Sequence, residues 1–236
     1  MKILFLTLLL AYNLFGDTNE VTQSWYYPKW VAKAPYNNPL IVKDTDSALG
    51  RYNIRTKKLD LKTMVKVHGH LCDGLTLGWV ELSYVLKKLF PNGVVDRTDV
   101  RVVSKNSPCL VDAGATMAGA RINFKTLSLD NKLAGGYIVA RISTGEAYAV
   151  HLKKGIFPAA QEDLEHQIRD RRKAGKDVSA KEIDAVEEMA DDLIRKLLYT
   201  APEKLLVLKK LKNYKFQFST KDFGKRSDII NKNMPR

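Results

Sequence analysis

The stretch KVHGHLCDGLTLGWVELSYVLKKLF, residues 66–90, joins a cluster of reactive side chains to the first clear helical pattern in the chain. Its second half places apolar residues mostly on one helical face, and the turn sequence PNG at 91–93 ends that pattern. These apolar residues are Leu75, Leu77, Val80, Leu82, Val85, Leu86 and Leu89. The cluster ahead of them consists of His68, His70, Cys72 and Asp73. Residues two positions apart point to opposite faces of a helix, so His70 and Cys72 can converge only in the turn before it.

Further elements follow this helix in a regular order. The run TDVRVVS at 98–104 alternates like a strand, and the small residues after Pro108 predict a tightly packed helix to about residue 122. Strand-like runs then occupy residues 123–129, 135–143 and 147–153, with hairpins as the simplest connections. The order helix, strand, helix and three strands predicts an α+β fold with helices on one face of a small sheet. We assign residues 60–155 to this core.

The segment after the core, residues 156–236, is predicted to be a basic and mostly helical extension. Helices are expected at 158–173 and, after the capping box SAKE at 179–182, as far as about residue 199. Another helix should follow TAPE at 200–203, and NYKFQFST at 213–220 alternates like an added strand. The middle helix carries an apolar stripe suited to packing on the core or on a neighbouring copy of the chain: Ile183, Val186, Met189, Ala190, Leu193, Ile194 and Leu197.

The N-terminal part of the chain has two sections. Residues 1–16 contain one lysine and then an apolar run too short to span a bilayer, which predicts a secretory signal peptide rather than a stable membrane span. Export to the periplasm is therefore expected. Residues 17–59 form an extended arm rich in aromatic residues, with no helical or strand period, which suits packing against the folded body or a neighbouring copy of the chain.

The chain is strongly basic. Its 236 residues include 39 Lys and Arg against 26 Asp and Glu, which gives a formal charge of +13. Such an excess suits polyanions, but it is more often a solvated surface, and no arginine-rich arm or nucleic-acid motif is present in the sequence. We therefore expect no nucleic-acid partner.

The only two cysteines, Cys72 and Cys109, both stand where helices are expected to begin. A helix N-terminus favours a thiolate, which is the form that binds metal. With an imidazole they would suit a divalent metal, with zinc first, and three protein ligands would leave one coordination position open. We predict His70, Cys72 and Cys109 as the ligands, with His68 and Asp112 as outer partners or alternate ligands. A structural Cys72–Cys109 disulfide is the alternative that an oxidising compartment would permit.

The two halves of this site resemble a known family. HGHLCDGLTLG resembles the HGHxCPGLxLG signature of proteins related to the E component of formylmethanofuran dehydrogenase, and NSPCLVDAGATMAGA resembles the second signature of that family. The resemblance covers about residues 60–152 and implies an α-β-α-β-β-β core, usually dimeric, with a metal near the cluster. This chain departs from the family at Asp73, which replaces a proline, and at Ala120, where many members have a cysteine. It also lacks the extra CxxC pairs of members with a C-terminal zinc finger.

Two functional classes are consistent with these residues. The first is an exported metal-binding protein, acting as a homodimer, that holds or delivers a divalent metal or a metal-containing cofactor. The second is an enzyme whose open zinc-type site acts on a small molecule, with His68 or Asp73 transferring the proton. The disulfide alternative would leave a protein without a metal.

Overall fold

The computed structural model describes residues 26–45, 55–133, 135–219 and 221. The predicted signal peptide and the end of the basic extension lie outside the described residues. The helices are α2 (Lys29–Ala32), α3 (Leu61–His68), α4 (Asp73–Leu89), α5 (Pro108–Ala118), α6 (Ala159–Lys173), α7 (Ala180–Tyr199) and α8 (Pro202–Leu205), with a short 3-10 turn at Arg97–Asp99. The strands are β1 (Leu40–Lys43), β2 (Lys57–Leu59), β3 (Val94–Asp96), β4 (Val100–Ser104), β5 (Leu127–Leu129), β6 (Tyr137–Arg141), β7 (Ala147–Leu152) and β8 (Leu206–Leu211). The predicted α+β class is confirmed, and the predicted core elements occur in the expected order, with α3 and β3 as additional elements that the sequence did not predict.

The main sheet has the strand order β5-β4-β6-β7-β8. The expected hairpin between β5 and β6 is wrong, because β5 pairs in parallel with β4 while β6 pairs antiparallel with the other edge of β4. A parallel pair needs a crossover connection, and α5 supplies it between β4 and β5. The connection from β5 to β6 must then pass to the opposite edge of β4. Only β6 and β7 form the predicted kind of hairpin within this core.

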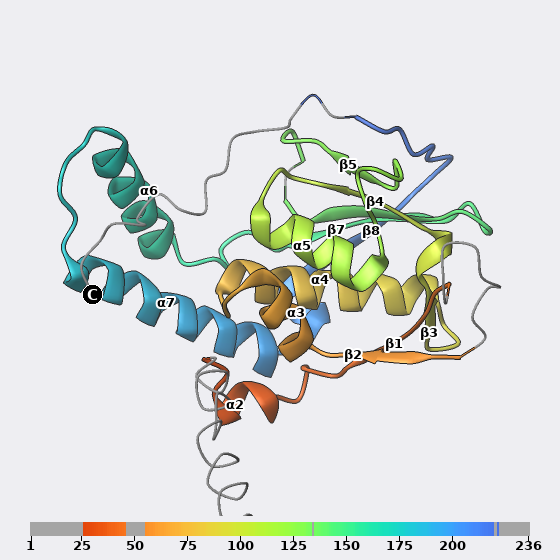
Figure 1. The fold of residues 1–236 in the computed structure, drawn as a ribbon, viewed down its shortest axis with the longest axis horizontal. Coiled ribbons are helices and arrows are strands. Elements are labelled where there is room, and N and C mark those ends of the chain that lie inside the picture. The colour runs from red at the N-terminus through yellow and green to blue at the C-terminus, as the bar shows by residue number, and fades with distance from the viewer. Residues whose placement is uncertain (1–25, 46–54, 134, 220, 222–236) are drawn as a thin grey trace, which may run out of the picture.

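Helix α4 lies at the centre of the fold. Figure 1 shows it between the five-stranded sheet and a smaller sheet of order β2-β1-β3, with α3 and α5 beside it. Most of its residues are buried, including Trp79, Leu82 and Leu86, each of which is fully inaccessible to solvent. A helix that is apolar nearly all round has to be covered on several sides. The position of α4 therefore fixes where the cluster at its N-terminus lies.

The aromatic arm contains more regular structure than the sequence predicts. Helix α2 and strands β1 and β2 all lie within residues 26–59, and β1 pairs with both β2 and β3. The pairing with β3 is parallel and joins the arm to the segment that follows α4. The strands are only three or four residues long, so their period of two is too short to stand out in the sequence.

After α7 the C-terminal extension continues as a strand rather than as a long helix. After the single turn of α8, β8 pairs antiparallel with β7 in the register Ala147↔Leu211 to Leu152↔Leu206. The strand predicted at 213–220 is wrong for the described residues 213–219, which have no strand conformation. The open edge of β7 offers unpaired backbone groups to the nearest extended segment, which outweighs the local helical preference of this lysine- and leucine-rich stretch.

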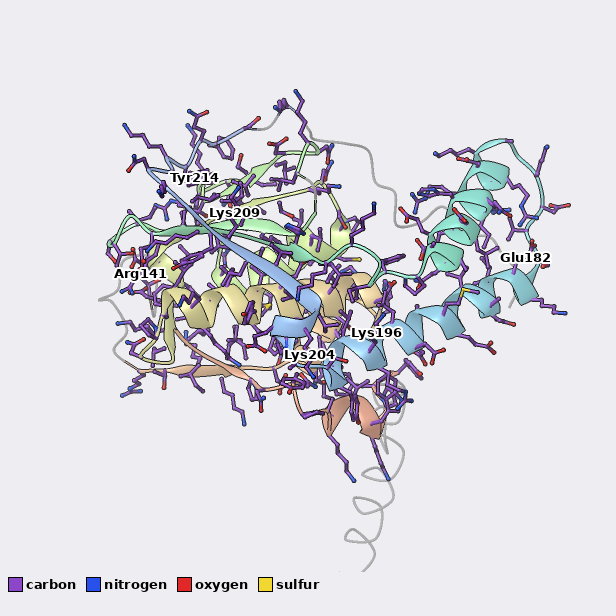
Figure 2. All side chains as sticks on the ribbon, turned by 180° about the vertical axis from the view of Figure 1, so that it is seen from behind. Arg141, Glu182, Lys196, Lys204, Lys209 and Tyr214 are labelled. Atoms are coloured by element: carbon purple, nitrogen blue, oxygen red, sulfur yellow. The ribbon has the colours of Figure 1, made fainter. Side chains whose placement is uncertain are left out.

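Helices α6 and α7 follow the sequence prediction closely, but only half of α7 is packed on the core. Leu193, Ile194, Leu197 and Leu198 are buried, and α7 contacts α4. The earlier part of the apolar stripe, Ile183 to Ala190, is only half-buried. Figure 2 shows Glu182 at the end of α7 that projects from the body with α6, and Lys196 near the end close to the sheets.

The predicted capping box at the start of α7 is present. The Ser179 hydroxyl accepts a hydrogen bond from the Glu182 backbone N–H, and the Glu182 carboxylate accepts from the Ser179 backbone N–H at 2.9 Å. The same carboxylate forms an ion pair with Arg171 of α6. This contact ties the projecting ends of the two helices together.

Replacing Ser179 with alanine should destabilise the first turns of α7 by about 1 kcal/mol, because one backbone N–H loses its acceptor. Since this end of α7 is not packed on the core, the loss should appear as local opening, with about fivefold faster amide exchange over residues 182–190. Hydrogen exchange followed by mass spectrometry measures this rate. Lys181→Ala is the control, because it changes an exposed neighbour without removing a cap; equal exchange in both variants would contradict a stabilising role for the cap.

Among the residues that the structure describes, no helix combines the length and the apolar character needed to cross a bilayer.

Candidate metal centre

Three helix ends meet where the two cysteine-containing motifs come together. His68 is the last residue of α3, and Gly69 ends that helix in the left-handed conformation with φ of 110°. Cys72 is the N-cap of α4, where its sulfur accepts a hydrogen bond from the Leu75 backbone N–H at 3.4 Å. Cys109 follows Pro108 in the first turn of α5. Both thiols therefore lie at helix N-termini, as the sequence predicts.

Close packing of α4 against α5 brings the two cysteines together. A Cβ atom on Gly74 would lie 3.0 Å from the Cys109 sulfur, and one on Gly78 would lie 2.9 Å from the Ala113 Cβ and 2.8 Å from the Tyr137 hydroxyl. The two glycines are one helical turn apart and lie on the same face of α4. Larger residues there would hold the helices further apart, so these glycines set the distance across the site.

The donor atoms of His68, Cys72 and Cys109 all lie within 4.8 Å of one another. The two sulfurs are 3.6 Å apart, and Nε2 of His68 lies 3.7 Å from the Cys109 sulfur and 3.9 Å from the Cys72 sulfur. The sulfur–sulfur distance is too long for a disulfide, which requires about 2.05 Å, and both thiols are free. The disulfide alternative therefore finds no support in this geometry.

Asp112 fixes the orientation of the His68 ring. Its Oδ2 lies 2.7 Å from Nδ1 of His68, so Nδ1–H donates to the carboxylate and Nε2 faces the sulfurs. The imidazole is well buried, with 4% of its side chain exposed, whereas 40% of the Asp112 side chain is exposed. A carboxylate that holds the outer nitrogen of a histidine is the usual arrangement behind a metal-ligating imidazole. Asp112 therefore contacts the nitrogen of His68 that faces away from the two sulfurs.

The same three groups form a charge-separated network. The Cys72 thiol donates to Cys109 and, with help from His68, lowers the pKa of Cys109 to about 5 despite its burial. The hydrogen bond to Cys109 raises the pKa of His68 to about 9. Burial acts in the opposite direction, and the hydrogen bond to Asp112 adds to the rise. The pKa of Cys72 is raised well above its usual value by its hydrogen bond to Cys109 and by burial. These shifts favour a Cys109 thiolate, a His68 imidazolium and a neutral Cys72 thiol in the metal-free protein.

We expect iodoacetamide to modify Cys109 of the metal-free protein at least about tenfold faster than Cys72 at pH 7, because the thiolate is the nucleophile. The rate at Cys109 should fall as the pH drops below its pKa of about 5, where the thiolate is protonated. Timed alkylation with peptide mass spectrometry measures both rates. In the Cys109→Ser variant the bond that raises the pKa of Cys72 is lost, so Cys72 should react faster there than in the natural protein. Equal modification of the two cysteines would contradict the asymmetric network.

His70 lies beside this group, not among its converging donors. It is exposed, its ring centroid is 4.7 Å from that of His68, and it lines a pocket together with Cys72 and Asp73. The imidazole that meets the two sulfurs is His68, whereas the sequence pattern favoured His70. The physical reason is the left-handed turn at Gly69, which ends α3 and directs the following residue away from the sulfurs.

The pocket beside the centre has a volume of about 710 Å³. Its walls come from the turn between α3 and α4, from α6 and from α7. The fully buried Gln161 stands behind one wall, where its amide N–H₂ donates to Asp73 at 2.7 Å and to Glu165 at 2.9 Å. Burial raises the pKa of Glu165. The hydrogen bond from Gln161 acts in the opposite direction, and the negative charge of Asp73 adds to the rise.

Sequence reasoning missed Gln161 and Glu165. They lie 88 and 92 positions after Asp73 in a helix whose pattern is that of a solvated charged helix. The one available signal is the four-residue spacing of Gln161 and Glu165, which places both on the same side of α6. That spacing does not indicate which part of the core this side of the helix faces.

The donor set fits a divalent metal of the zinc type. Tetrahedral bonds of about 2.3 Å to sulfur and 2.0–2.1 Å to nitrogen would place the sulfurs about 3.7 Å apart and the nitrogen about 3.6 Å from each. The observed separations of 3.6, 3.7 and 3.9 Å are close to these values. Two thiolates and one imidazole also match the ligand preference of a borderline-soft ion.

The chain matches a family model described as "FmdE, Molybdenum formylmethanofuran dehydrogenase operon" over residues 67–207. It is also similar to a solved structure from Syntrophus aciditrophicus, which is described as an FmdE-like protein of the tungsten formylmethanofuran dehydrogenase type. That likeness has 16% sequence identity and a TM-score of 0.39, and it covers 65% of this chain and 73% of the other. Among curated protein sequences, none matches the chain.

Proposed function

This chain belongs to the FmdE family, and we propose that it is an exported, homodimeric protein that binds a divalent metal, with zinc the best fit, through His68, Cys72 and Cys109. Asp112 orients the imidazole, and the metal or a metal-containing cofactor is held for use or delivery. The observation that carries this proposal is the convergence of three donor atoms within 4.8 Å on the side where the large pocket opens.

The residues of the chain account for much of what such a site requires. The helix start at Cys109 favours a thiolate, a bound divalent ion would favour the thiolate of Cys72 as well, and the Asp112 carboxylate keeps Nε2 of His68 directed at the sulfurs. A bound ion would supply Lewis acidity at a position left open by three protein ligands. Because Cys72 also lines the pocket, a molecule in the pocket could approach the side of the centre that the protein does not cover.

A metal-dependent enzyme acting on a small molecule is the second candidate, and one observation favours it. Asp73 and Glu165 line the pocket together with Cys72 and share the amide of Gln161. Paired carboxylates beside an open metal site are suited to proton transfer. Turnover of a substrate that is lost in Glu165→Gln, while metal binding is retained, would favour the enzyme over the carrier.

The proposed function is tested by elemental analysis of the protein from the periplasmic fraction, combined with a thiol count and an intact mass. We expect one zinc per chain, two alkylatable thiols after its removal, and a mass that lacks about the first 16 residues. A protein that retains Met1 would overturn the export proposal. A protein that contains no metal and cannot be loaded with zinc or cobalt would overturn the metal-binding proposal.

The dimer is proposed from the half-buried apolar stripe on the projecting part of α7. Apolar residues at Ile183 and Met189 lack the cover that Leu193 and Leu197 find on the core, and neither lines the pocket. We expect light scattering to report twice the chain mass at micromolar concentration, and Met189→Asp to shift the protein to monomer because a charge would be buried in the interface. Ile142→Asp, which changes an exposed residue elsewhere, is the control. A wild-type monomer would contradict the dimer.

A further inference from the structure

The pocket beside the metal centre is strongly acidic, although the chain as a whole is basic. Six of its lining residues carry carboxylates, and no lysine or arginine lines it among the residues that the structure describes. The carboxylates are those of Asp73, Glu165, Asp184, Glu187, Glu188 and Asp191. In a chain of net charge +13, this local reversal of sign needs a specific explanation.

Cations of the protein lie near the pocket but do not form its lining. Arg169 and His166 lie on α6 close enough to interact electrostatically with Glu165, and Arg195 interacts in the same way with Tyr26. The guanidinium of Arg195 packs over the Trp30 ring at 4.2 Å. The metal centre does not supply the missing charge, because two thiolates and a divalent ion sum to zero. Neutral groups hold three of the carboxylates, since Asp73 and Glu165 accept from Gln161 and Asp191 accepts from Tyr26. A cation in the pocket would supply the opposite charge that these neutral partners do not.

The remaining lining is apolar, which an inorganic ion would not need. Leu71, Val186, Ala190 and Ile194 contribute aliphatic surface, and Tyr26 contributes an aromatic ring that is 56% exposed. On α7 the residues 186, 190 and 194 follow one another at four-residue steps, so they form a stripe alongside the carboxylates of Glu187 and Asp191. Such a wall suits an aliphatic chain with charged ends, and an aromatic face adds attraction for an ammonium group.

A buried polar group also stands at this wall. Gln161 is fully buried, and its amide nitrogen holds the Asp73 and Glu165 carboxylates in place. Gln161 is not part of the pocket lining, so a ligand there would meet the two carboxylates and not the amide itself. An ammonium group brings three N–H donors, which carboxylate oxygens held in place can accept.

We propose that this pocket binds an aliphatic organic cation of the polyamine class, with its ammonium groups on the carboxylates and its methylene chain on the α7 stripe. A volume of about 710 Å³ is within the range of small-molecule sites. This inference extends the proposed function, since it names the class of ligand that would lie against the metal centre.

Calorimetric titration of the full mature chain with 1,5-diaminopentane tests the inference, and neutral 1,5-pentanediol serves as the matched probe. Both titrations use zinc-loaded and metal-free protein at one ionic strength. We expect the diamine to bind at least about tenfold more tightly than the diol, because only the diamine pairs with the carboxylates. Equal binding of the two probes, or no binding of the diamine, would overturn the inference.

Two exposed aspartates of α7 provide matched variants. Asp184 lines the pocket and Asp192 is not part of its lining, and each substitution to asparagine removes one negative charge. We expect Asp184→Asn to weaken diamine binding about three- to tenfold, and the double variant with Glu187→Gln to weaken it further. Asp192→Asn should change the affinity for the diamine less than about twofold. Equal effects of Asp184→Asn and Asp192→Asn would indicate a general charge effect and refute the site.

The failure of this inference and the failure of the proposed function can be told apart. If the chain takes up zinc but shows no preference for the diamine, the metal centre stands and the cation pocket is wrong. If zinc cannot be loaded but the diamine is still preferred, the pocket stands and the metal proposal is wrong. If the carboxylate variants slow zinc loading and the natural protein does not bind the diamine, the carboxylates serve inorganic ions. That result would overturn the inference.

Discussion

The His68→Ala variant is expected to bind zinc at least about a hundredfold more weakly than the natural protein, whereas His70→Ala should change the affinity less than about threefold. Loss of an outer partner of a metal ligand alone costs about 10- to 100-fold, so loss of a direct ligand should cost more. The distinction follows from the geometry, because Nε2 of His68 lies 3.7 and 3.9 Å from the sulfurs while His70 is exposed beside the pocket.

This comparison is measured by competition with a chromophoric chelator and by the thiolate-to-metal absorption of the cobalt-loaded protein. Asp112→Asn should fall between the two histidine variants, since it keeps all three donors but weakens the hold on the ring. Because His68 is well buried, the unfolding free energy of each metal-free variant must be compared as well. A loss of zinc binding in His70→Ala equal to that in His68→Ala would show that the ligand set is different from the one proposed.

The elements that the sequence predicts well are those with long, regular patterns. Helix α4 has seventeen residues with a continuous apolar face, and α7 begins at a capping box, so both could be located from the sequence alone. Elements of three or four residues in the aromatic arm could not, because β1 and β2 owe their conformation to pairing with each other and with β3. The same holds for β8, whose partner β7 lies more than 50 positions earlier.

The candidate site was predictable in its cysteines and less so in its histidine. Cys72 and Cys109 precede or open helices, and that position can be read from the residues that follow them. The choice between His68 and His70 depends on one backbone angle at Gly69, which spacing does not specify. The pocket depends on how α6 and α7 fold back toward α4, and the pattern of these helices shows which faces are apolar but not what covers them.

The close approach of α4 and α5 leads to the second prediction, that Gly78→Ala destabilises the metal-free protein by about 1–3 kcal/mol. The added Cβ would lie 2.8 Å from the Tyr137 hydroxyl and 2.9 Å from the Ala113 Cβ. Tyr137 is fully buried and its hydroxyl donates to the Leu110 carbonyl at 2.9 Å, so it has little room to move. The helices would have to separate, and the two cysteines with them.

Gly114→Ala is the matched control for this variant. Gly114 is also buried in the middle of a helix, but a Cβ there would meet its nearest neighbours at 3.6 and 3.7 Å, which is ordinary contact. Alanine gains roughly 0.8–1.0 kcal/mol of helix propensity over glycine at either position. Gly114→Ala should therefore be neutral or more stable and retain its zinc affinity. Gly78→Ala should lose stability and about tenfold or more in affinity, because misplaced ligands weaken a metal site.

Denaturant unfolding of the metal-free proteins and zinc competition of the loaded ones measure the two effects separately. If the helix contact sets the distance between the sulfurs, stability and zinc affinity should fall together in Gly78→Ala, and neither should fall in Gly114→Ala. A Gly78→Ala protein as stable as Gly114→Ala would mean that the helices can accept a methyl group between them. The spacing of Cys72 and Cys109 would then depend on the turns that precede the helices, and the two glycines of α4 would have no part in building the centre.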